Sequence, residues 1–143
     1  MTTAIHNLTS DEAAARARQM IGAGPAVPAI VWPVTRLDRV GERYYLVVLG
    51  DDRAAVGVAA IKVGNGDVMS WARLSGTSPH LSVDASDAAR LAGLGEAAPE
   101  LVWQPCQASA SPLYPLWRVT GGGRSVFVDQ QGKCWDRLAP KSA

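Results

Sequence analysis

The side chains that most often carry chemistry are few in this sequence. It has two histidines, His6 near the amino terminus and His80 in the segment GTSPHLSVD, and two cysteines, Cys106 and Cys134. It offers no histidine pair, no C-x-x-C and no H-E-x-x-H, whereas a metal site needs several such ligands that converge. We therefore expect no metal site and no cofactor.

Cys106 and His80 form the one pair that could act as a nucleophile and its base. No local motif supports that pairing, and the segment VWQPC places Cys106 at the end of an expected strand, which is typical of a core thiol. We therefore predict that the protein is not an enzyme. In a reducing cytosol we expect two buried thiols, and the alternative is a disulfide between Cys106 and Cys134.

The segment TGGGRS, with Arg124 beside three glycines, has the composition of a phosphate-binding loop. Such a loop needs a following helix whose backbone N–H groups point at the anion. Here the glycines precede SVFVD, which reads as a strand, so we interpret TGGGRS as a hairpin turn.

Five tryptophans are the chemically most informative residues, and all fall in expected strands. We expect about three of them to be buried in the core, because large aromatic side chains mostly supply buried area. A sheet that helices cover on one face leaves its other face open, and aromatic and arginine side chains there would anchor a protein interface. The candidate partner-binding residues are Trp117, Tyr114, Arg118, Trp103 and Trp32.

A long proline-interrupted connection, QASASPLYPLW, precedes the strand that carries Trp117. Connections of this kind often serve recognition. The alternative is an ordinary loop between strands that prolines stiffen.

The elements that must position these residues follow the same order in both halves. In the first half, TSDE predicts a capping box at Thr9 and a helix over residues 10–22 whose apolar stripe holds Ala13, Ala17, Met20 and Ile21. Four expected strands follow: AIVWPVTRL, which Pro33 interrupts; RYYLVVLG, which reads as covered on both faces; AAVGVAAIKV; and DVMSWARL.

The second half begins with a short capped helix, DASDAARLAGLG, that Gly93 and Gly95 end. The expected strands are ELVWQPC, PLWRVT, SVFVD and KCWDRL. At an offset of 71 residues, AVPAIVWPV matches AAPELVWQP, and Val48 and Gly50 match Val119 and Gly121. This predicts an internal repeat of residues 9–76 and 82–139, and the alternative is two unrelated meanders of similar composition.

Two such units predict one domain over residues 1–143. The expected fold class is α+β, with two repeated helix–antiparallel-meander units that form a roughly eight-stranded antiparallel sheet with two helices on one face. A single unit would bury too little apolar surface to be stable alone.

Helix–meander units that end in a hairpin of the type VFVDQQGKCW resemble cystatin-like and PepSY-like modules of bacteria. A tandem pair is similar to the architecture of the beta-lactamase inhibitor proteins, and this resemblance implies an open sheet that grips another protein. It implies no functional residue, and the secreted location and paired disulfides of those inhibitors are not expected here.

Composition limits the classes of partner. The net charge of +1 and pI near 7.8 disfavour a nucleic-acid binder, which needs excess cations for the phosphates. Neither a secretory signal nor an apolar run long enough for a bilayer is present, so we expect a cytoplasmic protein without a membrane partner.

Three functions are consistent with these observations. The first is a non-catalytic protein-interaction module, of a binding, inhibitor or immunity type, that uses the aromatic sheet face or the proline-rich loop. The second is a small-molecule-binding or small enzymatic domain with a pocket where Asp129, Arg118 and Cys106 converge. The third is a self-assembling protein, a homodimer through an open sheet edge or apolar face.

Overall fold

The protein is α+β, as the sequence predicts. The computed structural model describes residues 7–51, 53–94 and 98–139, so His6 and Gly95 lie outside the described residues. In those ranges it has two helices and eight strands: α1 (Ser10–Ile21), β1 (Ala29–Arg36), β2 (Arg43–Asp51), β3 (Ala54–Lys62), β4 (Val68–Arg73), α2 (Ala85–Ala92), β5 (Ala98–Trp103), β6 (Leu116–Gly121), β7 (Arg124–Val128) and β8 (Cys134–Trp135).

The eight strands form a mixed sheet in the order β4-β3-β2-β1-β5-β6-β7-β8. Most neighbours are antiparallel, but β1 and β5 are parallel, with Thr35 opposite Val102 and Arg36 opposite Trp103. The prediction of a purely antiparallel sheet is therefore wrong at this pair. A tight hairpin forces two strands to be antiparallel, whereas β1 and β5 are separated by β2, β3, β4 and α2, so no hairpin sets their directions.

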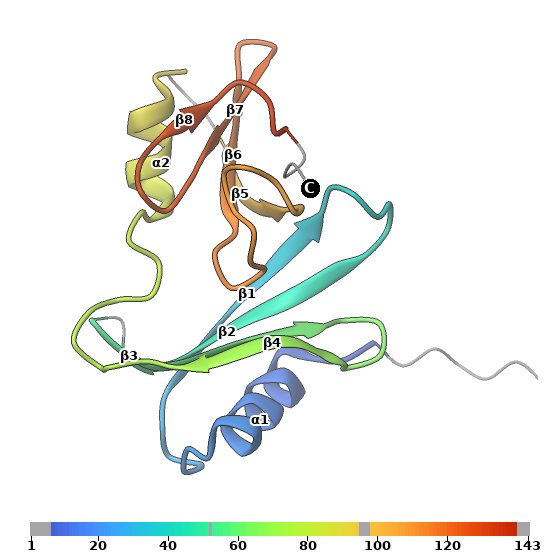
Figure 1. Ribbon diagram of the computed structural model, residues 1–143, viewed down its shortest axis with the longest axis vertical. Coiled ribbons are helices and arrows are strands. Elements are labelled where there is room, and N and C mark those ends of the chain that lie inside the picture. The colour runs from blue at the N-terminus through green and yellow to red at the C-terminus, as the bar shows by residue number, and fades with distance from the viewer. Residues whose placement is uncertain (1–6, 52, 95–97, 140–143) are drawn as a thin grey trace, which may run out of the picture. The chain divides into compact units, whose positions relative to one another are not determined.

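The chain divides into two compact units. Unit 1 comprises Met1–Pro33 and Gly41–His80, and unit 2 comprises Val34–Val40 and Leu81–Ala143. The division falls within β1, so this strand contributes residues to both units. Figure 1 shows α1 with β2, β3 and β4 in the first unit, and α2 with β5 to β8 in the second.

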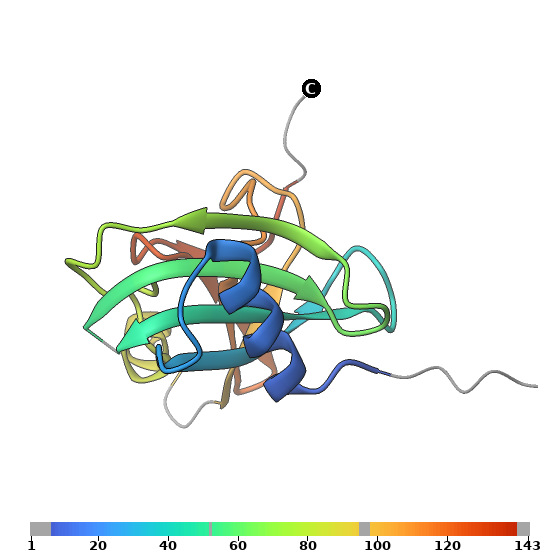
Figure 2. The same ribbon diagram turned by 90° about the horizontal axis from the view of Figure 1, so that it is seen from below.

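In unit 1 the predicted capping box is present. The Thr9 hydroxyl accepts from the backbone N–H of Glu12, and the Glu12 carboxylate accepts from the N–H of Thr9, each at 3.1 Å. Figure 2 shows α1 lying across the strands of this unit. Its buried face is made mainly of alanines, and Met20, which we expected in the stripe, is 40% exposed.

Small residues allow α1 to approach the sheet closely. A Cβ on Gly57 in β3 would lie only 2.9 Å from Cδ1 of Ile21 in α1. Strand β2 is buried on both faces, because Val47 and Leu49 pack in the cluster with α1 while Leu46 and Val48 are buried on the alternate face. The prediction that RYYLVVLG is covered on both faces is thus confirmed.

In unit 2 the helix α2 is short, with only Ala88 buried. Asp84 caps its amino end by accepting from the N–H of Asp87 at 2.8 Å, and Gly93, at φ +65°, ends it as predicted. Cys134 is exposed, so the expectation of two buried thiols is wrong for this residue, and its thiol donates to the carbonyl of Leu91 in α2. This contact identifies the face of the unit 2 sheet on which α2 packs.

Strand register in unit 2 assigns the other residues to faces. Leu101, Trp117, Val128 and Cys134 are directly opposite one another in β5, β6, β7 and β8, so they share the α2 face. The adjacent row is Glu100, Arg118, Phe127 and Trp135. Because successive side chains of a strand alternate, this second row lies on the face away from α2.

Candidate functional site

Trp117, the first of the predicted partner-binding residues, lies in the core of unit 2. Its side chain is 6% exposed, and its indole Nε1 donates to the carbonyl of Val83 at 2.7 Å. That hydrogen bond satisfies the only polar group of the indole. Trp117 therefore fixes the segment that leads into α2.

Trp103 is also buried, at 4% exposed. The guanidinium of Arg36 lies over its ring at 5.0 Å from the centroid, and Arg36 donates to both carboxylate oxygens of Asp38, at 2.9 and 2.7 Å. This bidentate hydrogen bonding from Arg36 lowers the pKa of Asp38 below its ordinary value. Trp103, Arg36 and Asp38 thus form a stacked and ion-paired cluster within unit 2.

The remaining three predicted residues lie nearer the surface. Arg118 is ion-paired with Glu100, its Nε lying 2.8 Å from Oε1, on the face away from α2. Tyr114 is 45% exposed, and Trp32 is half-buried in the part of β1 that belongs to unit 1. The five predicted residues therefore do not gather into one patch.

Unit 2 contains a groove of about 660 Å³. This volume is within the range of sites that hold ligands. It is formed by Ser82, by the connection between β5 and β6, and by the hairpin between β7 and β8. The lining residues from these two segments are Gln107, Ala108, Ser109, Ala110, Ser111 and Tyr114 from the connection, and Asp129, Gln130, Gln131, Lys133 and Trp135 from the hairpin.

Internal hydrogen bonds shape the connection wall of the groove. The Ser109 hydroxyl donates to the carbonyl of Tyr114 at 2.6 Å, and the Ser111 hydroxyl accepts from the N–H of Leu113 at 3.2 Å. Leu113 and Pro115 are buried and anchor the far end of the segment. The proline-rich connection is therefore held in one conformation while it presents Tyr114 to solvent.

Asp129 organises the hairpin wall. Its carboxylate accepts from the backbone N–H groups of Gln131 and Lys133, both at 2.9 Å, and from Nε1 of Trp135 at 3.0 Å. Gly132, at φ +82°, supplies the left-handed residue that this tight turn requires. The side chain of Trp135 is thereby held against the groove by its own indole N–H.

Gln130 connects the two walls to the rest of unit 2. Its side-chain oxygen accepts from the N–H of Val83 at 3.0 Å, and its amide nitrogen donates to the carbonyl of Pro115 at 3.3 Å. One side chain thus bonds the hairpin to the residues before α2 and to the end of the connection. The groove is built from segments that are fixed to one another.

Sequence reasoning placed Tyr114 at the surface and named the connection that carries it, but it missed Trp135 and Lys133. The hairpin VFVDQQGKCW contained part of the signal, since counting the alternation across the turn places Trp135 on the same face as Phe127. Of the residues proposed for an alternative pocket, Asp129 lines the groove. Arg118 and Cys106 are not among its lining residues, and the Cys106 thiol donates to the carbonyl of Ser109.

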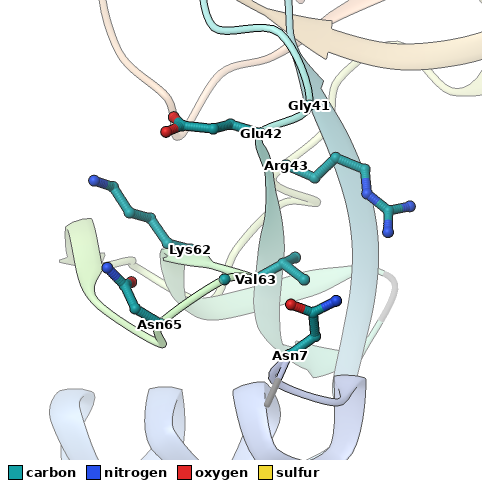
Figure 3. A pocket seen from close by; sticks show the side chains of 8 residues that line it. Asn7, Gly41, Glu42, Arg43, Lys62, Val63 and Asn65 are labelled. Atoms are coloured by element: carbon teal, nitrogen blue, oxygen red, sulfur yellow. The ribbon is translucent and has the colours of Figure 1, made fainter. Parts of the chain in front are cut away.

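A second hollow lies in unit 1, where β2 begins and β3 ends, and it measures about 180 Å³. Figure 3 shows the side chains of Glu42 and Lys62 directed toward the same open side, while Arg43 points away from them. The hollow is smaller than typical ligand sites, and Glu42, Arg43 and Asn65 are exposed. The groove of unit 2 is therefore the better candidate.

Two further findings concern the described residues. None of their helices has the length and apolar character to cross a bilayer. In the same ranges, no three His, Cys, Asp or Glu side chains gather as they would around a metal ion. Neither the family models, nor the curated proteins, nor the solved structures with which we compared the chain give a match.

Proposed function

We propose that this protein is a non-catalytic interaction module that holds a segment of a partner protein in the groove of unit 2. The observation that carries the proposal is the placement of two aromatic side chains, Tyr114 and Trp135, from two separate walls of one open groove of about 660 Å³. Tyrosine and tryptophan are the residues that most often anchor protein interfaces, because each combines a large apolar area with a polar group.

The fixed walls of the groove support this function physically. A binding surface that is already ordered loses less conformational entropy when a partner arrives, so more of the contact energy becomes affinity. Hydrogen bonds within the walls hold the groove in shape, and they are made by the Asp129 carboxylate, the Gln130 amide and the Ser109 hydroxyl. These polar groups therefore have a positioning role, and the partner contacts the aromatic side chains that they hold.

The other predicted residues take supporting places in this proposal. Arg118 and Phe127 continue the row of Trp135 across the sheet, so they extend the binding surface from the groove onto the face away from α2. Trp117 and Trp103 support that surface from within the core of unit 2. Trp32 belongs to unit 1, and this proposal gives it no role.

We also infer that the two halves are copies of one helix–meander unit, of the kind found in cystatin-like and PepSY-like modules. The support is that α1 is followed by β1 to β4, and α2 by β5 to β8, with consecutive strands adjacent in the sheet in each half. A cytoplasmic location belongs to the same proposal. Its support is that both cysteines are free, which suits a reducing compartment.

The proposal can be tested with a displayed library of random twelve-residue peptides selected on the purified full chain. Tyr114→Ala and Trp135→Ala should each weaken the selected peptides by roughly tenfold or more, because truncating an interface anchor typically costs more than about 1.4 kcal/mol. Trp71→Ala is the matched control, since Trp71 is a 38% exposed tryptophan of unit 1. Circular dichroism verifies the fold of each variant.

Two outcomes would reject the proposal. One is that no peptide is enriched over repeated rounds of selection. The other is that the selected peptides bind the Tyr114→Ala and Trp135→Ala proteins as tightly as the parent, or lose affinity equally with Trp71→Ala.

A small-molecule-binding function is the second candidate, and the volume of the groove favours it, because pockets for small ligands measure about 300–1,000 Å³. A thermal-shift screen with a chemically diverse fragment library distinguishes the two. Fragments that stabilise the protein through Tyr114 and Trp135, together with an unsuccessful peptide selection, would favour the small-molecule function. The exposure of Tyr114 supports the peptide, because an extended chain can lie across an open groove.

A further inference from the structure

We infer that the segment bound in the groove is acidic, and that a carboxylate of the partner pairs with Lys133. This inference rests on the proposed function and specifies the chemistry of the partner. It follows from the charges and hydrogen-bonding groups that an incoming chain would meet in the groove.

The groove has two formally charged lining residues, Asp129 and Lys133, but only one of them is accessible. Asp129 is 7% exposed, and its carboxylate already accepts three N–H groups. Because the residue is buried and its carboxylate is bonded to the hairpin's own N–H groups, a ligand cation has little access to it. A partner would therefore find no accessible negative charge in the lining.

Lys133 differs from Asp129 in both exposure and pairing. Its residue is exposed, and its ammonium lies 4.2 Å from the ring centroid of Trp135. No ion pair of Lys133 is found among the residues that the structure describes. The ammonium is thus held next to an aromatic anchor of the groove, where a carboxylate can pair with it without separating an existing ion pair.

The neutral lining groups include several that can donate to a ligand acceptor. The Ser111 hydroxyl accepts from the N–H of Leu113, which leaves its proton for another acceptor. Ser82 and the amides of Gln107 and Gln131 add further donors. A carboxylate has two oxygens that accept several hydrogen bonds each, so it matches one cation surrounded by neutral donors.

Two displayed libraries of the same length test the inference, one with all residue types and one without Asp and Glu. The full library should yield groove binders that carry an acidic residue. Changing that residue to Gln or Asn should weaken binding roughly tenfold, as expected for loss of one partly desolvated charge pair. Lys133→Glu should weaken these peptides at least as much and select basic peptides instead.

Lys62→Glu is the matched control, because it makes the same change of charge in unit 1 and should leave peptide binding unaltered. Lys133→Gln removes the positive charge without adding a negative one. It should still weaken peptide binding, because the ion pair with the peptide carboxylate is lost. The inference is overturned if Tyr114-dependent peptides come equally from the library without Asp and Glu, or if they bind the Lys133→Glu protein unchanged. If neither library yields peptides that depend on Tyr114, the proposed function itself is rejected.

Discussion

The two units of this protein contain the same kinds of element but distribute their residues differently. In unit 1, β2 and β3 have nine residues each. In unit 2, β5 and β6 have six, β7 has five and β8 has two. Unit 2 uses the remaining residues for the connection over residues 104–115 and for the hairpin turn, both of which line the groove.

Under the proposed function, this difference makes unit 1 the scaffold and unit 2 the binding unit. Long strands with tight turns surround a small hollow of about 180 Å³ in unit 1, whereas a long connection beside a short edge strand surrounds a groove of about 660 Å³ in unit 2. A loop that rigid strands hold can vary its side chains without changing the core. The contrast predicts that mutations in unit 1 change stability, and that mutations in the walls of the groove change binding.

The largest effect on stability is expected for the tryptophan that supports the groove from inside. Trp117→Ala should reduce the free energy of unfolding by about 3–5 kcal/mol, because it leaves a large cavity and removes the hydrogen bond to Val83. Trp71→Ala, at a 38% exposed site in unit 1, should cost less than about 1 kcal/mol. Chemical denaturation followed by circular dichroism measures both, and equal losses would contradict the burial that we describe.

A smaller but still large effect is expected in unit 1, at a glycine of β2. Gly50 has φ +115°, and a Cβ there would lie 2.3 Å from the carbonyl oxygen of Ala54. Gly50→Ala should therefore cost roughly 2–3 kcal/mol through backbone strain and collision. The control is Gly64→Ala, whose Cβ would meet nothing within 4 Å, and a loss at Gly64 as large as that at Gly50 would contradict this explanation.

The helix caps allow a direct comparison of the two units, because in each helix a side-chain oxygen at the N-cap accepts a backbone N–H. Thr9→Ala removes the capping box of α1, and Asp84→Ala removes the single cap of α2. Each should cost about 1 kcal/mol of unfolding free energy. Because α2 has one buried residue and α1 has four, amide hydrogen exchange should accelerate more broadly in α2 than in α1. Equal exchange in both helices would mean that packing does not distinguish them.

The smallest effect concerns the ion pair beside Trp103. The lowered pKa of Asp38 means that the charged carboxylate contributes stability above its ordinary value of 3.8, and that this contribution is lost as the pH falls through the lower, folded-state pKa. Asp38→Asn should therefore cost up to about 1 kcal/mol at neutral pH and progressively less in acid below about pH 4.

Asp136→Asn provides the comparison for Asp38, since its pair with Arg124 is 3.6 Å long and its side chain is 88% exposed. Denaturation curves at several pH values should show no effect of Asp136→Asn. A loss for Asp38→Asn that stays constant down to pH 2 would show that the Arg36 pair is not its cause.

The sequence predicted the elements well, because local chemistry determines them. The capping box at Thr9, the left-handed glycine that ends α2 and the hairpin at residues 121–124 each depend on a few neighbouring residues. The unbroken apolar run in β2 likewise indicated burial on both faces. The parallel pairing of β1 and β5 was not predictable in this way, since it joins strands far apart in the chain.

The candidate site was predicted only in part, because some of its features depend on local sequence and others on long-range packing. The connection was identified from its prolines, whereas Tyr114 was expected on an exposed sheet face and lies in the connection before β6. The burial of Trp103 and Trp117 depends on which face of the sheet α2 covers, and residue type does not determine that face. Trp135 and Lys133 are site residues because the hairpin that the Asp129 carboxylate organises lines the same groove as the connection.

The most direct test of the central claim is a titration of the ¹⁵N-labelled protein with a selected acidic peptide, followed by heteronuclear NMR. Five tryptophans give five indole N–H signals that can be assigned by substitution. We predict that the Trp135 indole and the backbone signals of Gln107, Tyr114 and Lys133 shift in proportion to bound peptide, while the Trp71 indole does not. Shifts confined to unit 1, or an unchanged Trp135 signal at saturation, would contradict the claim that unit 2 is the binding unit.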